Sequence, residues 1–285
     1  MLLGAHMSTA GGLPTAFERA EPLGCTAVQI FTSSPRRWKG RDLSEEDVAA
    51  FREAWEASSC EECFAHDIYL TRLGTRDETI LEMSREAFVR ELETCGRLGL
   101  SALVFHPLGD ADSDEEAVLD RVADSLNLVL DRVEDGGTVV CLETTAGQGS
   151  DVGYRFEQLA RILEGVERAD RVAVCLDTCH VFVAGYDIST DAGYEETIDA
   201  LDAAVGLERL RAIHLNDSKR PCGSRVDRHT HIGRGEIGEG AFRRVMTDPR
   251  LAGIPKVIET PKVDDMDREN LALLRRLAGE EGAGS

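Results

Sequence analysis

The chain has 285 residues, and its 53 acidic against 32 basic side chains give a formal net charge of −21. An apolar content of 42% excludes a disordered chain. The sequence has no run of about 18 apolar residues typical of a membrane span, and its start lacks the basic and apolar regions of a signal peptide. The acidic balance argues against a general nucleic-acid binder, which normally carries a basic excess.

Short apolar runs rich in β-branched residues predict eight strands. In chain order they cover residues 2–5, 27–31, 63–65, 102–105, 138–142, 172–176, 211–213 and 256–258. Segments with helical spacing lie between them, for example residues 45–58, 76–98, 115–133, 156–163 and 266–277. Strands that alternate with helices imply parallel pairing, because a parallel connection needs a crossover.

The length of the chain fits a barrel built from these units. Eight strand–helix units in 285 residues average about 36 residues each, the size expected of a (β/α)8 TIM barrel. We therefore expect one α/β barrel domain over residues 1–278, followed by a disordered tail at 279–285. A doubly wound open sheet is the alternative.

A polar residue that can bind metal follows almost every predicted strand. The residues at these carboxyl ends are His6, His66, His106, Glu143, Asp177, His214 and Glu259. In a barrel all carboxyl ends converge on one face, where the active site lies. An open sheet would spread the same residues along an edge, so the pattern favours the barrel.

Five histidines and four carboxylates form a candidate metal centre. They are His66, His106, His180, His214, His229, Glu143, Asp177, Asp227 and Glu259. Each alone has an ordinary explanation, such as a core histidine or a helix N-cap, but carboxylates buried together would repel without cations. Nine ligands exceed the four of one zinc ion and suit two or three metals, with zinc favoured and manganese an alternative. Clustered divalent ions suit phosphodiester hydrolysis.

The distribution of basic residues adds two observations. Only four of the 32 are lysine, and scarce lysine with excess acid favours a halophilic protein over an ordinary acidic one, since the Debye length is only ~3 Å at 1 M salt. Residues 33–41 hold four basic residues and no acid, and residues 217–236 hold five against three. These clusters are either chance surface groupings or two phosphate-binding loops on one barrel face.

The spacing of the cysteines is typical of a protein of the reducing cytoplasm. The eight cysteines include a single C-x-x-C pair, formed by Cys60 and Cys63. A lone pair is weak evidence for zinc or redox chemistry. We interpret it as structural in a reducing cytosol.

Several long motifs resemble the endonuclease IV family, the zinc-dependent apurinic/apyrimidinic endonucleases of DNA repair. The motifs are Leu-Glu-Thr-Thr-Ala-Gly-Gln-Gly at 142–149, Leu-Asp-Thr-Cys-His at 176–180, His-Leu-Asn-Asp at 214–217, Gly-Ser-Arg-Val-Asp-Arg-His at 223–229 and His-Ile-Gly at 231–233. The resemblance extends from residue 4 to residue 260 and implies a TIM barrel with three zinc ions. The implied ligand groups are His66, His106 and Glu143; Glu143, Asp177, His214 and Glu259; and His180, Asp227 and His229.

The resemblance also implies a reaction. In the family, a metal-bridging hydroxide attacks the phosphate 5′ to an abasic sugar and leaves a 3′-hydroxyl and a 5′-deoxyribose phosphate. Family members also trim blocked 3′ ends. Glu143 and Glu259 are accordingly the expected catalytic residues, and His6 and His231 are expected to support the metal ligands from behind.

Three positions match residues that the family inserts into DNA to open the stack at an abasic site: Arg36, Tyr69 and Leu70. Their ordinary interpretations are a surface arginine and two core residues. Opening the stack is least costly where a base is already missing. The expected partner is double-stranded DNA with abasic sites, bound by a monomer because one barrel face lies on the DNA. Ala65, the pair Thr71 and Arg72, and the segment at 108–113 depart from the family pattern.

Two other functions are compatible with parts of this pattern. Sugar isomerases and epimerases similar to xylose isomerase use this barrel with Glu, Asp, His and Glu ligands, which Glu143, Asp177, His214 and Glu259 would satisfy. That alternative leaves the other five candidate ligands and both basic segments unexplained. A lesion-binding protein with structural zinc would be expected to lack a ligand, and none of the nine is missing.

Overall fold

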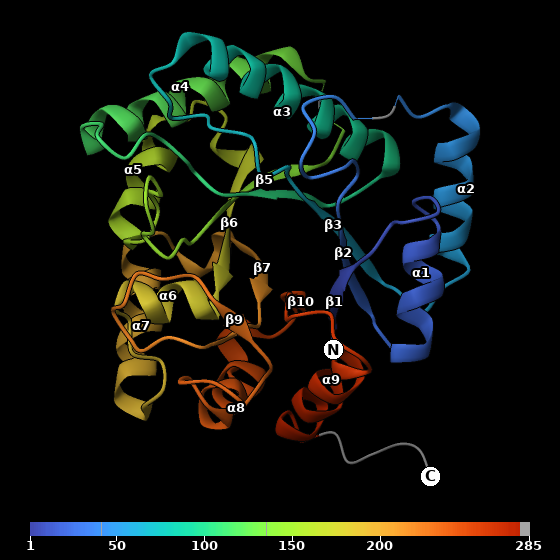
Figure 1. Cartoon of the computed structure of the whole chain (residues 1–285), viewed down its shortest axis with the longest axis vertical. Coiled ribbons are helices and arrows are strands. Elements are labelled where there is room, and N and C mark those ends of the chain that lie inside the picture. The colour runs from blue at the N-terminus through green and yellow to red at the C-terminus, as the bar shows by residue number, and fades with distance from the viewer. Residues whose placement is uncertain (41, 135, 280–285) are drawn as a thin grey trace.

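Eight parallel strands close into a barrel in a computed structural model that describes residues 1–40, 42–134 and 136–279. The strands are β1 (Leu3–Met7), β2 (Ala27–Ile30), β3 (Glu62–His66), β4 (Ala102–Phe105), β5 (Val139–Glu143), β6 (Val172–Asp177), β7 (Leu210–His214) and β10 (Lys256–Ile258). Their order around the barrel is β1-β10-β7-β6-β5-β4-β3-β2, and β2 pairs with β1 to close it (Figure 1). The predicted single-domain barrel is confirmed, and the open sheet is excluded. After Gly279, the predicted disordered tail lies outside the described residues.

Helices surround the barrel (Figure 1). They are α1 (Thr15–Ala20), α2 (Glu45–Glu56), α3 (Glu78–Leu98), α4 (Glu115–Arg132), α5 (Phe156–Gly165), α6 (Thr178–Ala184), α7 (Asp191–Ala204), α8 (Glu239–Thr247) and α9 (Met266–Leu277). Short 3-10 turns at Glu21–Leu23, Ala169–Arg171, Leu207–Arg209 and Pro249–Leu251 also occur. After β7, β8 (Asp217–Ser218) pairs antiparallel with β9 (His229–Thr230). Among the described residues, none of the helices is both long and apolar enough to cross a bilayer.

Capping residues determine where the helices begin and end. The Asp77 side chain accepts hydrogen bonds from the backbone N–H groups of Thr79 and Ile80. Because Asp77 is the N-cap, α3 begins at Glu78, two residues later than predicted. The helix ends as predicted before Gly99, which has a φ of 82°, a conformation that glycine adopts without strain.

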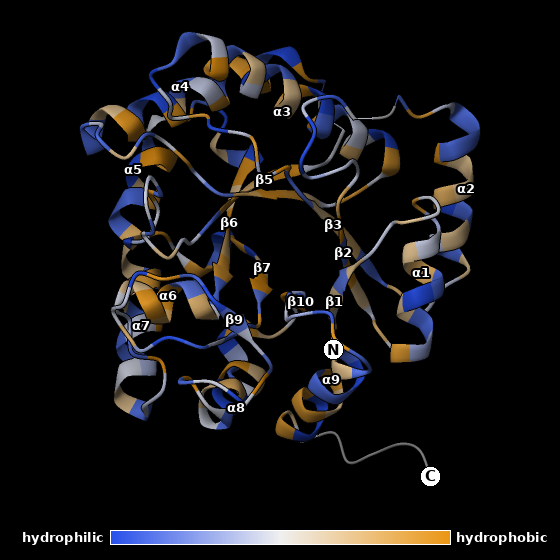
Figure 2. Ribbon diagram, in the orientation of Figure 1, coloured by the Kyte–Doolittle hydropathy of each residue, from blue (hydrophilic) through white to orange (hydrophobic). Residues whose placement is uncertain are grey.

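Apolar residues form two layers of core, one inside the barrel and one between the barrel and its helices. The barrel strands are accordingly largely hydrophobic in Figure 2. The inner layer is built largely from small residues such as Ala27, Ala102 and Ala173, together with Phe64. β1 and β2 lie so close at Gly4 that a Cβ there would be 1.7 Å from the carbonyl oxygen of Ala27. This dense, apolar interior leaves the carboxyl ends of the strands as the place for polar side chains.

The cysteines are consistent with a structural role. All eight are free, and Cys60 and Cys63 are both buried. Burial raises the pKa of the Cys63 thiol well above its usual value, so the thiol is protonated and unreactive.

Candidate metal centre

The carboxyl ends of the barrel strands bring the candidate ligands together. Four of the barrel strands end at a candidate ligand: β3 at His66, β5 at Glu143, β6 at Asp177 and β7 at His214. His106 and Glu259 directly follow β4 and β10, His180 lies in the first turn of α6, and His229 begins β9. Because the strands are parallel and the barrel is closed, residues far apart in the sequence meet on one face.

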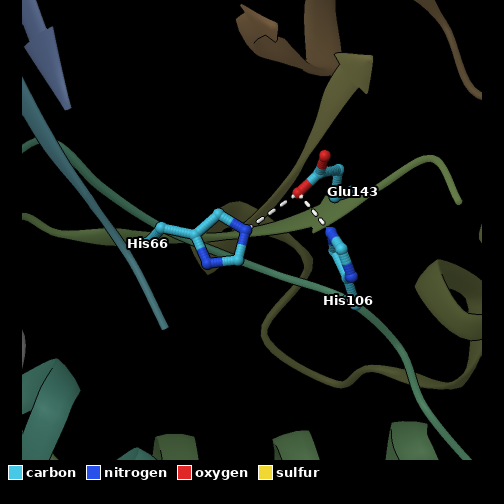
Figure 3. Close-up of side chains that lie close together, drawn as sticks. All are labelled: His66, His106 and Glu143. Atoms are coloured by element: carbon cyan, nitrogen blue, oxygen red, sulfur yellow. Dashed lines mark hydrogen bonds and ion pairs between the residues drawn. The ribbon is translucent and has the colours of Figure 1, made fainter. Parts of the chain in front are cut away.

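Glu143 is the centre of the site. Its side chain is completely buried, and its Oε2 lies 3.1 Å from His66 Nε2 and 3.0 Å from His106 Nε2 (Figure 3). Its Oε1 lies 3.0 Å from His214 Nδ1 and 3.3 Å from His180 Nδ1. One buried carboxylate thus contacts four imidazoles.

A second group of ligand atoms adjoins the first. One atom from each of its members lies within 4.8 Å of the others, and the members are Glu143, Asp177, His214 and Glu259. His214 Nδ1 lies 3.3 Å from Glu259 Oε2 and 3.8 Å from Asp177 Oδ2. The three carboxylates therefore converge on one imidazole nitrogen.

A third group lies on the loop side of the site. His180 Nε2 is 3.4 Å from Asp227 Oδ2, and His229 Nε2 is 3.2 Å from Asp227 Oδ1. Burial acts to raise the pKa of Asp227, but the hydrogen bond from His180 and the nearby imidazoles hold it at about 2. The carboxylate is therefore ionised between its two histidines.

The electrostatics of the cluster favour a cation. Burial acts to raise the pKa of Glu143, but the imidazoles of His106 and His214 hold it well below its usual value. Burial acts to lower the pKa of His180, but Asp177 and Asp227 raise it well above its usual value. The buried carboxylates are thus stabilised by nearby positive charge. Protonated imidazoles or bound divalent cations can supply it.

The donor set fits metal ions. Within the described residues, His229 Nε2 is buried and has no hydrogen-bond partner, although it points toward Asp227. Such an orphaned nitrogen is unusual in a core and ordinary in a metal ligand. Cys179 lies near Asp177 and His229 as another ligand-type residue, but burial raises the pKa of its thiol to about 12, which disfavours the thiolate a metal would need.

A cavity of about 680 Å³ opens over these residues, and its wall includes His66, His106, His180, His229 and Glu259. The wall also includes the basic residues Arg228 and Lys262. The cavity gives a substrate access to all three groups.

The three predicted DNA-opening residues lie on the loops beside this cavity. Arg36 is exposed and Leu70 is half-buried, while Tyr69 is 57% exposed and lines the cavity. The Tyr69 N–H donates to the carbonyl of Pro35, so the two loops are joined. The exposure of Tyr69 does not fit its interpretation as a core residue. Of the basic segment at 33–41, residue 41 lies outside the described part of the chain.

Sequence reasoning missed several residues that support the site. Gln29 is fully buried and contacts both His214 and Glu259, and Asn216 donates to Asp177 and accepts from the Glu259 N–H. The available signal for Gln29 was a lone amide in the apolar strand β2. Of the two expected supporting histidines, His6 lies 3.3 Å from Glu259.

The other expected supporting histidine lies elsewhere. His231 Nδ1 accepts a hydrogen bond from Asn270 on α9. Asn270 also donates to Thr260, the residue after Glu259. Within the described residues, His231 therefore connects to the candidate metal centre through Asn270 and the backbone, and contacts none of the candidate ligands directly.

A family model described as a xylose isomerase-like TIM barrel matches residues 17–277. The closed barrel and the ligand-type residues at its carboxyl ends place the protein in this class. A D-tagatose 3-epimerase-like protein has the same fold, with a TM-score of 0.76 over 98% of this chain and 97% of its own. At 16% identity, that likeness shows the fold alone.

Within the class, the sequence decides the family. A probable endonuclease 4 from Chloroflexus aggregans is 48% identical over 96% of both chains, and one from Geobacter sulfurreducens is 46% identical over 96% of this chain and 94% of its own. The crystal structure of endonuclease IV from Thermus thermophilus matches with a TM-score of 0.86 and 40% identity, over 99% of this chain and 100% of its own. The chain belongs to the endonuclease IV family, which confirms the predicted enzyme class, a hydrolytic deoxyribonuclease of DNA repair.

Proposed function

We propose that the chain hydrolyses the phosphodiester 5′ to abasic sites in double-stranded DNA, with three zinc ions, and leaves a 3′-hydroxyl and a 5′-deoxyribose phosphate. We include the trimming of blocked 3′ ends in this proposal. The observation that carries it is the set of three adjoining ligand groups around Glu143. A single metal would need only one of these groups.

The proposed ligands follow the three groups. They are His66, His106 and Glu143 for the first zinc; Glu143, Asp177, His214 and Glu259 for the second; and His180, Asp227 and His229 for the third. Imidazole and carboxylate donors suit zinc, and manganese suits the carboxylate-rich second group as an alternative. When bound, the ions would activate water near neutral pH and neutralise charge on the scissile phosphate.

The two proposed catalytic carboxylates have different surroundings. Glu143 is fully buried and joins the first two groups, so it organises the centre. The Glu259 side chain is 18% exposed and lines the cavity. Of the two, Glu259 is therefore the one that a bound phosphate can approach.

The loops beside the cavity are proposed to bind the damaged strand. Arg36, Tyr69 and Leu70 would enter the stack where the base is missing, and Tyr69 offers an exposed aromatic face. Arg228 and Lys262 on the cavity wall would contact phosphates. Positive charge placed on this face reconciles a DNA substrate with a net charge of −21. We further propose a monomer that acts in the cytoplasm of a halophilic cell.

A sugar isomerase is the second candidate function, because Glu143, Asp177, His214 and Glu259 do form one ligand group on a barrel shared with epimerases. It explains less of the site. His66 and His106 contact Glu143 directly, and His180, Asp227 and His229 form a group of their own. A single-metal sugar enzyme has no use for them.

The deciding experiment incubates the purified protein with a duplex oligonucleotide that carries one abasic analogue, at high salt and with zinc supplied. We expect one cut on the 5′ side of the lesion and a product with a 3′-hydroxyl, while an undamaged duplex of the same sequence stays intact. Absence of cutting would refute the proposed function, and ketose–aldose interconversion in a parallel assay would support the isomerase. Elemental analysis counts the metals.

A further inference from the structure

We infer that Gln29 is a positioning residue of the metal centre that selects the tautomer of His214 and the orientation of Glu259. The inference rests on the proposed function, because it treats His214 and Glu259 as metal ligands. Gln29 lies in β2 between apolar residues, and its side chain is completely buried. A buried amide destabilises a core unless its hydrogen bonds are made, so its place in β2 needs an explanation.

The amide of Gln29 contacts three side chains of the site. Its Oε1 lies 2.7 Å from His214 Nε2. Its Nε2 lies 2.5 Å from Glu259 Oε1 and 2.8 Å from His6 Nδ1. Both ends of the amide are therefore used, and every partner lies at or next to a proposed ligand.

The chemistry of these partners determines which way the amide points. A carboxylate only accepts hydrogen bonds, so the NH₂ group of Gln29 must face Glu259 and the carbonyl must face His214. A carbonyl also only accepts, so His214 must carry a proton on Nε2. The opposite orientation would place the amide oxygen against the carboxylate of Glu259 and would leave both without a donor.

This tautomer turns Nδ1 of His214 toward the metal centre. Nδ1 lies 3.0 Å from Glu143 Oε1 and 3.3 Å from Glu259 Oε2. When His214 carries a single proton, the three atoms present lone pairs to one another, which a shared cation would satisfy. Gln29 thus makes Nδ1 the nitrogen of His214 that is available as a ligand, in the way that outer partners of metal-bound histidines select their tautomer.

His6 does not replace Gln29 as the support of Glu259. His6 Nδ1 accepts one of the two amide hydrogens of Gln29, so it has no hydrogen of its own to donate to Glu259, 3.3 Å away. His6 and Gln29 are paired in the β1–β2 register. The amide, held from the side by His6, is therefore the donor that holds Glu259.

Two substitutions separate the hydrogen bonds from the volume of the side chain. Gln29→Met fills a similar volume without either hydrogen bond. Gln29→Glu keeps an acceptor for His214 but repels Glu259. The matched control is Asn127→Leu, which removes an amide bonded at both ends, to Gly165 and Glu167, on the outer helix α4.

The first measurement uses the metal-free protein. Histidine ¹⁵N NMR at a pH above the raised pKa of His214, where its imidazole carries a single proton, reports which nitrogen holds that proton. The His214 signals are identified by their loss in His214→Gln. We expect the Nε2-protonated pattern in the wild type, in Gln29→Glu and in Asn127→Leu, and its loss in Gln29→Met. An unchanged pattern in Gln29→Met would overturn the inference, and this readout does not depend on catalysis.

The second measurement titrates zinc against a chelator without DNA, followed by cleavage kinetics. We expect Gln29→Met and Gln29→Glu to bind one of the three zinc ions about 10- to 100-fold more weakly, with a lower kcat and an unchanged KM, and Asn127→Leu to match the wild type. Wild-type zinc affinity in Gln29→Met would overturn the role of Gln29. If the wild type neither binds zinc nor cuts abasic DNA, the proposed function fails, and the NMR result alone then decides whether Gln29 selects the tautomer.

Discussion

At the scale of single residues, Asp177 serves the fold and the site at once. Its Oδ1 accepts a hydrogen bond from the His180 N–H and caps α6. Its Oδ2 accepts from Asn216 and faces His214 Nδ1. Most aspartates serve either as a helix N-cap or as a metal ligand. Asp177 can serve as both, because one carboxylate oxygen caps α6 while the other faces His214.

The proposed catalytic role of Glu259 predicts a loss of chemistry without a loss of binding. Residues that only support metal ligands cost about 10- to 100-fold when removed, so Glu259→Gln should lower the single-turnover cleavage rate at least about 100-fold. Binding of abasic duplex, followed by fluorescence anisotropy, should change little. Glu269→Gln is the control, because Glu269 is exposed and pairs with Arg234. Loss of binding with retained cleavage would contradict the assignment.

Tyr69 is expected to act on recognition of the lesion. Stacking between an aromatic side chain and a base is worth about 1–3 kcal/mol, so Tyr69→Ala should weaken binding of abasic duplex by about 5- to 150-fold. The melting temperature should not change, because the side chain is 57% exposed. Leu128→Ala is the comparison, since Leu128 is exposed on α4. Equal binding of the abasic duplex by both variants would show that Tyr69 does not contribute to recognition of the lesion.

At the scale of elements, the segment that contains β8 and β9 carries Asp227 and His229 to α6. The side chain of Asp217 holds this segment, because it accepts hydrogen bonds from the backbone N–H groups of Ser218, Gly235 and Ile237. The segment has little regular structure of its own. Its shape therefore depends on this buried carboxylate as well as on the short β8–β9 pairing.

Asp217→Ala is accordingly expected to disorder the third ligand group. Each lost hydrogen bond to a charged group costs about 1.5–3 kcal/mol before relaxation, so the segment should open and the zinc content should fall from three ions to two. Zinc stoichiometry and amide hydrogen exchange of residues 217–237 measure this. The control Asp77→Ala removes the cap of α3 for about 1 kcal/mol and should retain all three ions. Equal zinc content in both variants would contradict the prediction.

At the scale of the whole molecule, the proposed DNA substrate has to be reconciled with a net charge of −21. Self-repulsion of this size destabilises a compact fold in dilute salt. The exposed basic residues Arg36, Arg228 and Lys262 lie at or near the cavity. A locally basic face on an acidic protein can still select DNA when salt screens the remaining surface.

The melting temperature should therefore rise as KCl increases from 0.1 to 1 M, because the Debye length falls from about 10 to ~3 Å. Over the same range, affinity for undamaged duplex should fall steeply, since phosphate contacts release counterions. Thermal unfolding and anisotropy titrations at several salt concentrations measure the two trends. A melting temperature that does not depend on salt would favour an ordinary acidic protein over a halophilic one.

The sequence by itself determined the order of the barrel strands, the parallel barrel and the polar residue at the carboxyl end of most strands. The exception is His6, which was expected after the first strand but lies inside β1. These features follow from patterns within a few residues, such as apolar runs and helical spacing, so they can be read locally. It also indicated the nine ligand candidates, through motifs and strand ends. The helix boundaries shifted by only about two residues.

Only the tertiary structure decided which of these residues touch. Gln29 and His214 are 185 positions apart and meet because closure of the barrel leaves only β1 and β10 between β2 and β7. The double use of Asp177, the exposure of Tyr69 and the distance of His231 from the ligands likewise depend on strand register and loop packing. No local pattern encodes such contacts, because they form only when all eight strands are in place.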